Sequence, residues 1–161
     1  MNYKIISLIA FVLLTSFSNV PNKNLDILTP SESVKPAVSR FVSVYNELNS
    51  NSFASPSFES FSIALEGFYK LKRNGQVTKD ILTLIDFSMS SNSKRLWVID
   101  LTTNKVLFNS LVAHGKNTGE EFAQKFSNTE SSYQSSLGFY VTESTYNGNN
   151  GYSLKLLGMD S

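Results

Sequence analysis

Residues 95–119 read RLWVIDLTTNKVLFNSLVAHGKNTG. Two runs of apolar, β-branched and aromatic residues flank a polar turn at residues 102–105, a pattern that predicts a β-hairpin. Side chains of a strand alternate between two faces, and both faces of the first run are apolar, so we expect that strand to be covered on both sides. In the second run, we expect Val106, Phe108 and Val112 to share one face. This hairpin should form the centre of the fold.

The second run ends at His114-Gly115, which contains the only histidine of the chain. An imidazole at a strand end before a glycine is suited to a general base at the mouth of a cleft. A structural histidine that hydrogen-bonds within its own loop is the other interpretation, and the residues alone leave both open. Residues 115–119 lack the upstream glycine and the Gly-Lys-Ser/Thr order of a phosphate-binding loop.

Other catalytic constellations find little support in the sequence. No Gly-x-Ser-x-Gly motif occurs, which disfavours a serine triad. One histidine without clustered carboxylates offers no metal-ligand set, so we expect no metal, and no motif indicates a cofactor. The chain contains no cysteine, which excludes a disulfide, a thiolate metal site and a cysteine nucleophile within these residues.

The length of 161 residues predicts one domain with a sizeable core. A net charge of +1 argues against nucleic acid as the main partner. Residues 1–18 have the pattern of a secretory signal peptide, with Lys4, an apolar run at 5–14 and a small-x-small site at 16–18. The run is too short to span a bilayer, which needs about twenty residues. We therefore expect export across the inner membrane to the periplasm or cell envelope, with no membrane anchor after cleavage; a buried N-terminal strand or helix is the alternative.

The rest of the chain divides into three parts. Residues 19–35 are polar and predict a linker. Residues 36–75 predict a hairpin of two helices packed on the sheet, the first beginning at Pro36 and ending at Asn49 and the second spanning 58–74 before Gly75.

Residues 76–161 predict further strands at 81–87, 137–143 and 152–157, with a turn at 146–151 that contains two Asn-Gly steps. The order of helices followed by strands predicts an α+β, mainly β fold with a mostly antiparallel sheet. Oligomeric state is not indicated by the sequence.

Several sequence blocks resemble, in order, those of the murein L,D-transpeptidase catalytic domain (YkuD-like): LWVIDL at 96–101, VAHGKNTG at 112–119 and SSLGFYVT at 135–142. Residues 148–159 resemble the next block, and the resemblance extends from about Pro36 to the end of the chain. It implies a β-rich fold with a substrate cleft, and peptidoglycan stem peptides as substrate and partner.

In such enzymes a cysteine thiolate attacks the carbonyl of the third stem residue and expels the terminal D-alanine, and an amine of another stem resolves the acyl-enzyme into a 3–3 cross-link. The catalytic histidine and cysteine of the family lie in a later block, His-Gly followed by Ser-x-Gly-Cys. We therefore expect that block beyond Ser161, no catalytic residue in this chain, and an incomplete L,D-transpeptidase-like sheet in residues 76–161 that is inactive as given. A non-catalytic secreted murein-binding module is the alternative.

His114 matches the earlier His-Gly block of the family, not the catalytic one. The resemblance makes it, together with neighbouring residues of the matched blocks, a candidate for the wall of the substrate cleft. The candidates are His114, Gly115, Asn117, Ser136, Gly138 and Tyr140.

Overall fold

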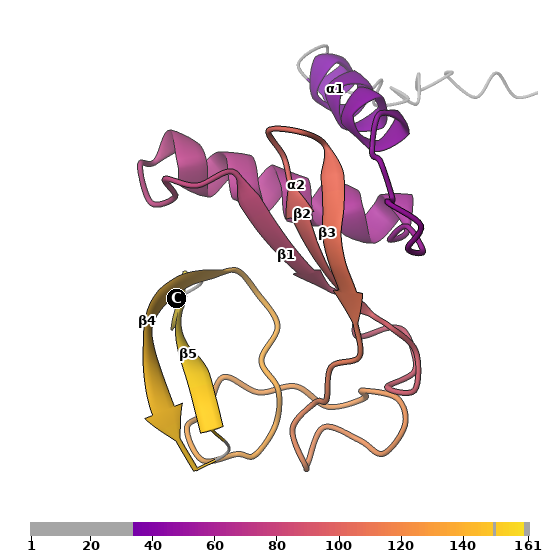
Figure 1. Cartoon of the computed structure of the whole chain (residues 1–161). Coiled ribbons are helices and arrows are strands. Elements are labelled where there is room, and N and C mark those ends of the chain that lie inside the picture. The colour runs from indigo at the N-terminus through magenta and orange to yellow at the C-terminus, as the bar shows by residue number, and fades with distance from the viewer. Residues whose placement is uncertain (1–33, 150, 160–161) are drawn as a thin grey trace, which may run out of the picture. The chain divides into compact units, whose positions relative to one another are not determined.

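The computed structural model describes residues 34–149 and 151–159 (Figure 1). The predicted signal peptide and residues 19–33 of the predicted linker lie outside this part of the chain. Across the described ranges, no helix is both long enough and apolar enough to cross a membrane. The elements in chain order are α1 (Val34–Asn46), α2 (Phe58–Arg73), β1 (Ile81–Ile85), β2 (Leu96–Asp100), β3 (Lys105–Ser110), β4 (Tyr140–Gly148) and β5 (Gly151–Gly158).

Helix α1 begins at Val34 rather than Pro36 and ends at Asn46 rather than Asn49. Its end is set by the sheet, because Asn49 leaves the helical path and forms a parallel bridge with Lys105. The Asn49 N–H donates to the Asn104 carbonyl at 2.7 Å, and the Asn49 carbonyl accepts from the Val106 N–H at 2.9 Å. The segment after α1 is thereby tied to the edge of β3.

Helix α2 has the terminal signals that its sequence predicts. Ser57 is the N-cap, and its side chain accepts a hydrogen bond from the Ser60 N–H at 3.1 Å. Glu59 lies in the first turn and three basic side chains lie in the last, which complements the helix dipole. Gly75 follows the helix with a φ of 71°, a left-handed conformation that favours glycine.

Strands β1, β2 and β3 form an antiparallel sheet in that order, and α2 packs across one of its faces (Figure 1). The core lies between them and consists of buried side chains from both layers: Phe61, Ala64, Leu65, Phe68, Leu82, Leu84, Trp97, Ile99 and Val106. The other face carries the exposed Ile81, Ile85 and Phe108, while Leu96 and Val98 are half-buried. The prediction that β2 is covered on both sides is therefore wrong for the described residues.

A β-bulge changes the faces of β3. Val98 pairs with Phe108 and Ile99 pairs with Val106, so the register shifts between them and Leu107 is the extra residue. Val106 consequently lies in the core, whereas Phe108 lies on the opposite face with 63% of its surface exposed. The prediction that these two side chains share a face fails because strict alternation does not hold through a bulge.

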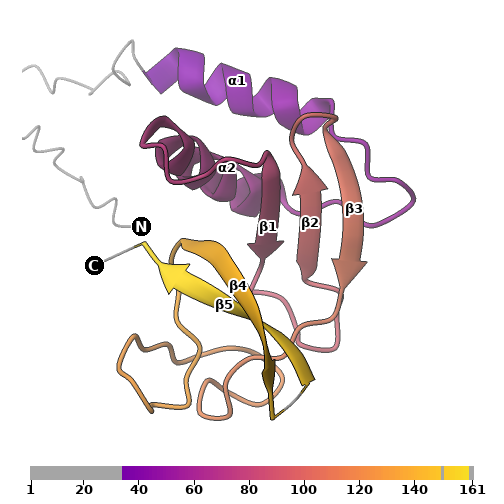
Figure 2. The same ribbon diagram turned by 60° about the vertical axis from the view of Figure 1, so that its left-hand side comes forward.

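Strands β4 and β5 form a second, two-stranded antiparallel sheet (Figure 2). Strand β4 begins at Tyr140 rather than Leu137, and both strands extend into the predicted turn, so that Gly148 pairs with Gly151. The structure is compatible with the predicted α+β class, although its strands divide between two sheets. The finer description, a mainly β fold that carries a helical hairpin, stays a prediction.

The base of this hairpin contacts α2 through Phe139, the residue before β4. A Cβ built on Gly67, in the middle of α2, would lie 2.0 Å from Cε1 of the Phe139 ring, so the ring rests directly on the helix backbone. The Met159 N–H, just after β5, donates to the Phe139 carbonyl at 2.8 Å. Gly67 therefore provides the space in which the hairpin base packs.

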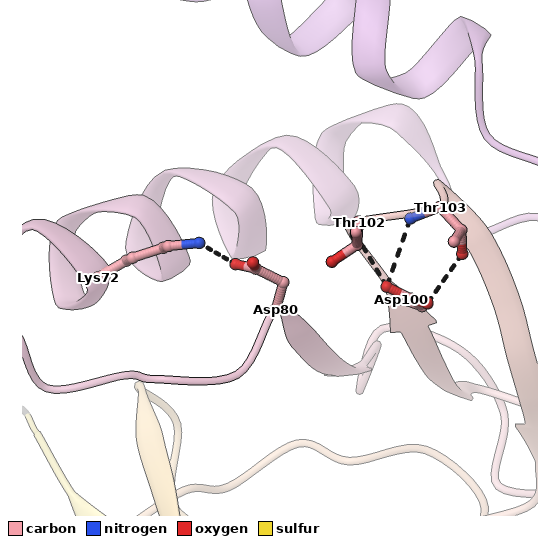
Figure 3. A network of polar contacts seen from close by, with 5 residues as sticks. All are labelled: Lys72, Asp80, Asp100, Thr102 and Thr103. Atoms are coloured by element: carbon pink, nitrogen blue, oxygen red, sulfur yellow. Dashed lines mark hydrogen bonds and ion pairs between the residues drawn. The ribbon is translucent and has the colours of Figure 1, made fainter.

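Acidic side chains hold two connections of the first sheet (Figure 3). Asp80 pairs with Lys72 of α2 just before β1 begins. Asp100 accepts hydrogen bonds from the Thr103 hydroxyl and the Thr102 N–H, both at 2.8 Å, and these bonds lower the pKa of its carboxyl. The side chain of Asp100 thus organises the turn between β2 and β3.

Candidate functional site

Arg95 is completely buried at the start of β2. Its guanidinium donates to the Val112 carbonyl from Nε at 3.3 Å and from Nη2 at 3.1 Å, and to the Met89 carbonyl from Nη1 at 2.7 Å. Its Cζ lies 5.1 Å from the centroid of the Phe87 ring, within cation–π range. A buried charge is tolerated only when its hydrogen-bonding groups find partners, and here the Val112 and Met89 carbonyls supply them. Strand β3 ends at Ser110, which pairs with Leu96 at the start of β2, so the predicted second run is a strand only as far as that residue.

The Arg95 guanidinium also determines the state of His114. Nη2 lies 2.8 Å from Nδ1 of His114, and arginine can only donate, so Nδ1 is the acceptor and carries no proton. The other ring nitrogen, Nε2, lies 3.1 Å from the Gly119 carbonyl and must therefore be the N–H donor. Both nitrogens of this neutral imidazole are engaged within the fold. This geometry supports the structural interpretation of His114 rather than the general-base interpretation.

The loop after His114 is joined to residues 132–135. The Gly115 N–H donates to the Ser135 hydroxyl at 2.9 Å, and the Ser135 N–H donates to the buried Thr118 hydroxyl at 2.7 Å. The Asn117 N–H donates to the Tyr133 carbonyl at 2.9 Å, and its side-chain amide donates to the Ser132 carbonyl at 2.9 Å. A Cβ on Gly115 would lie 2.5 Å from the Tyr133 carbonyl oxygen. Glycine is required at position 115 because the two backbones approach so closely.

An open groove of about 510 Å³ lies along residues 116–125. Its lining includes the cationic Lys116 and Lys125, the anionic Glu120 and Glu121, and the exposed ring of Phe122. The Thr118 carbonyl closes the segment by accepting from the N–H groups of Gln124 and Lys125 at 2.9 and 3.0 Å. The groove therefore presents side chains of both charges, and the hydrogen bonds to the Thr118 carbonyl hold the backbone that carries them.

The structure brings only some of the predicted cleft residues together. His114, Gly115 and Asn117 belong to one hydrogen-bonded loop, and Asn117 also lines the groove. Ser136 directly follows Ser135 of this network, and its own hydroxyl donates to the Ser127 carbonyl at 2.9 Å. Gly138 and Tyr140 lie at the base of the β4–β5 hairpin, Gly138 with a φ of 127° and Tyr140 paired with Gly158. That these residues line a substrate cleft stays a prediction.

Sequence reasoning missed three residues that hold this loop: Arg95, Thr118 and Ser135. Arginine and threonine are mostly exposed in proteins, so composition and periodicity give no reason to place Arg95 or Thr118 in the interior. Ser135 belongs to a serine-rich segment that predicts only a loop. The one feature of the sequence that marks Arg95 is its position immediately before the central apolar strand, and this position does not predict burial.

A further polar cluster joins α2 to the loop after β1. Asp86 accepts hydrogen bonds from the Ser60 hydroxyl and the Ser88 hydroxyl, both at 2.6 Å, and from the Ser88 N–H at 3.0 Å. Partial burial raises the pKa of the Asp86 carboxyl, but these hydrogen bonds and the positive charge of Arg95 outweigh it and leave the pKa below its ordinary value. Asp86 is thus held in its ionised form.

Within the described residues, no group of three or more histidine, cysteine, aspartate or glutamate side chains is placed to hold a metal ion. The charged and polar side chains along the groove can form hydrogen bonds and ion pairs.

The comparison with known families identifies the class of domain. The L,D-transpeptidase catalytic domain family matches residues 54–161, a range that begins just before α2 and includes every strand. The chain belongs to this family, which confirms the resemblance seen in its sequence blocks. No curated protein and no solved structure matches the chain.

Proposed function

We propose that this chain is part of a secreted enzyme that cross-links peptidoglycan stem peptides by L,D-transpeptidation. The observation that carries this proposal is the family match over residues 54–161. In the proposed reaction, a thiolate attacks the carbonyl of the third stem residue, the terminal D-alanine leaves as the amine, and the side-chain amine of a second stem then displaces the thiolate. The product is a 3–3 cross-link.

The thiolate of that reaction must come from residues that are not among these 161, because the chain contains no cysteine. His114 is also unsuited to activate a thiol, since both of its ring nitrogens bond within the fold. We propose that the catalytic His-Gly and Ser-x-Gly-Cys block follows Ser161 and that the chain is inactive as given.

Exposed apolar side chains support the idea that further polypeptide completes the domain. Leu154, Leu156 and Leu157 of β5 are all about half exposed or more, and Phe108 projects from the sheet face opposite α2. Exposed apolar side chains on strands are typical of faces that another part of a protein covers.

The experiment is to express the chain together with the coding sequence that adjoins it in the same frame, and to supply disaccharide tetrapeptide. We expect release of D-alanine and formation of 3–3 dimers by mass spectrometry, both abolished when the added cysteine is replaced by alanine. An extended protein that folds and contains the cysteine block but releases no D-alanine would contradict the proposal, as would the lack of such a block in any frame.

Export is a separate part of the proposal and rests on the pattern of residues 1–18. Expression of the full chain with a C-terminal tag should yield envelope-localised protein whose N-terminus lies near Asn19. Recovery of protein that still begins at Met1 would contradict export through a cleaved signal.

A non-catalytic murein-binding module is the second candidate, favoured by the lack of cysteine and by the exposed rings of Tyr146 and Tyr152 on the β4–β5 hairpin. Exposed aromatic rings can pack against sugar rings. Sedimentation with isolated sacculi separates the two functions. If the chain of 161 residues is a binding module, it should sediment with the sacculi and be depleted from the supernatant without any added polypeptide.

A further inference from the structure

A continuous path of hydrogen bonds runs from the buried Arg95 to the groove along residues 116–125. Arg95 donates to Nδ1 of His114, and Nε2 of His114 donates to the carbonyl of Gly119, which lines the groove. The guanidinium itself is anchored on the Val112 and Met89 carbonyls. The position of Gly119 is therefore fixed from the interior of the protein.

Close packing of the backbone also restricts the conformation at Gly119. Its φ is +156°, and a Cβ there would lie 2.1 Å from the Phe122 carbonyl oxygen, so the chain folds closely back on itself. The neighbouring Thr118 carbonyl holds the N–H groups of Gln124 and Lys125. Glu121 is held as well, because its carbonyl accepts from the Ser91 N–H at 2.9 Å and its carboxylate from the Ser90 hydroxyl at 2.6 Å. The His114 bond is the contact that joins Gly119 itself to the Arg95 side chain.

We propose that Arg95 and His114 are positioning residues that set the shape of the groove, and that the groove binds a peptide bearing both a carboxylate and an ammonium group. The ligand chemistry follows from the lining, where Lys116 and Lys125 can pair with a carboxylate and Glu120 and Glu121 with an ammonium. Stem peptides carry both groups, so this inference rests on the proposed function and names a binding surface for it.

The first measurement uses the unaltered 161-residue chain. Nitrogen-15 NMR of His114 should show a single neutral tautomer, with Nδ1 unprotonated and Nε2 carrying a slowly exchanging proton. Arg95→Lys should abolish this signature, because a lysine ammonium cannot reach two carbonyls and the imidazole in the same geometry. Detection of the Nδ1–H tautomer, or of rapid exchange between tautomers, in the unaltered chain would overturn the role of Arg95.

The second measurement is titration with a stem tetrapeptide, followed through the backbone amides of residues 116–125. The unaltered chain should show saturable shifts there, and His114→Ala should weaken binding about tenfold, the effect of roughly one lost hydrogen bond. His114→Gln should restore most of the affinity, since its amide has both an acceptor and a donor. Thr103→Ala is the matched control: it removes a side-chain hydrogen bond to Asp100 in the β2–β3 turn, at the opposite end of the hairpin from Arg95. It should lower stability and leave the affinity unchanged.

Equal affinities of the unaltered chain and His114→Ala would overturn the positioning role, as would an equal loss in Thr103→Ala. Saturable shifts outside residues 116–125, or none at all, would overturn the groove as the peptide site. Such a result is distinct from failure of the proposed function, because the extended enzyme would still release D-alanine from tetrapeptide. If Arg95→Lys does not fold, the tautomer of the unaltered chain and the comparison of the two His114 variants still decide the inference.

Discussion

Gly67 is the residue through which the β4–β5 hairpin contacts α2, and its replacement by alanine tests that contact. Alanine favours a helix over glycine by about 1 kcal/mol, so the change would stabilise an isolated helix. Its Cβ, however, would lie 2.0 Å from the Phe139 ring, and overpacking of this kind costs about 1–3 kcal/mol. We expect Gly67→Ala to lower the free energy of unfolding in urea.

The double variant Gly67→Ala, Phe139→Leu is the control for this prediction. With a smaller side chain at position 139, the added methyl group has room. The stability lost through Gly67→Ala, measured as the difference between the double variant and Phe139→Leu alone, should therefore be smaller than in the unaltered chain. A stabilising effect of Gly67→Ala in the Phe139 background would show that the ring does not rest on the helix.

Asp86 predicts a specific dependence of stability on pH. Partial burial raises its folded-state pKa, but the hydrogen bonds from Ser60 and Ser88 lower it by more, so the pKa lies below the ordinary value of 3.8. A carboxyl with a depressed folded pKa stabilises the fold above its unfolded pKa, and this contribution is lost as pH falls through the folded pKa. We expect Asp86→Asn to be less stable than the unaltered chain at neutral pH, and the difference to narrow below about pH 4.

The measurement is urea unfolding at a series of pH values, with Glu66→Gln as a control that removes an exposed negative charge from the same region. A stability difference between Asp86→Asn and the unaltered chain that stays constant from pH 7 to strongly acidic pH would contradict the assignment.

At the residue scale, the site could be predicted in part. His114 drew attention as a lone histidine before a glycine, and the structure shows why it is there: it links Arg95 to Gly119. Its partner Arg95 could not be predicted, because a guanidinium becomes a tolerable interior group only when distant loop carbonyls converge on it. Without knowing that Arg95 contacts His114, the sequence could not decide between a general base and a structural histidine.

At the element scale, Ser57 provides a test of how the sequence starts α2. Its hydroxyl accepts from the Ser60 N–H, and loss of such a cap costs about 0.5–2 kcal/mol. The same hydroxyl lies 2.7 Å from the Ser60 hydroxyl, which in turn donates to Asp86. We expect Ser57→Ala to reduce the free energy of unfolding by about 1 kcal/mol, measured by urea denaturation.

Ser55→Ala, at an exposed position before Pro56, is the matched control and should have little effect. An equal loss in both variants would indicate that the segment before α2 acts through its backbone conformation and not through the cap.

The elements themselves were largely predictable, and the exceptions share a cause. Helix α2, the strand cores and the β2–β3 turn follow from local periodicity and capping, which the sequence displays directly. The ends of α1 and β3 do not, because they depend on the backbone bonds of Asn49 to β3 and on where β2 begins to pair with β3. The bulge at Leu107 is likewise a property of strand pairing, and it exposes Phe108, which alternation had placed beside Val106.

At the scale of the whole molecule, the described residues combine a packed helix-and-sheet core with a hairpin whose apolar side chains are exposed. The core between α2 and the first sheet is closed by buried residues from both layers. Residues 140–148 and 151–158, the two strands of the β4–β5 hairpin, instead include no buried side chain. This difference is expected if the core folds from the present residues and the hairpin requires additional polypeptide to cover it.

We propose that this member of the L,D-transpeptidase catalytic domain family acts on stem peptides only together with residues that supply a cysteine. The direct test is mass spectrometry of purified disaccharide tetrapeptide after incubation with the 161-residue protein. We predict neither free D-alanine nor 3–3 dimers above a protein-free blank. Cross-linked dimers made by this protein alone would contradict the account, because they would require a nucleophile other than a thiol.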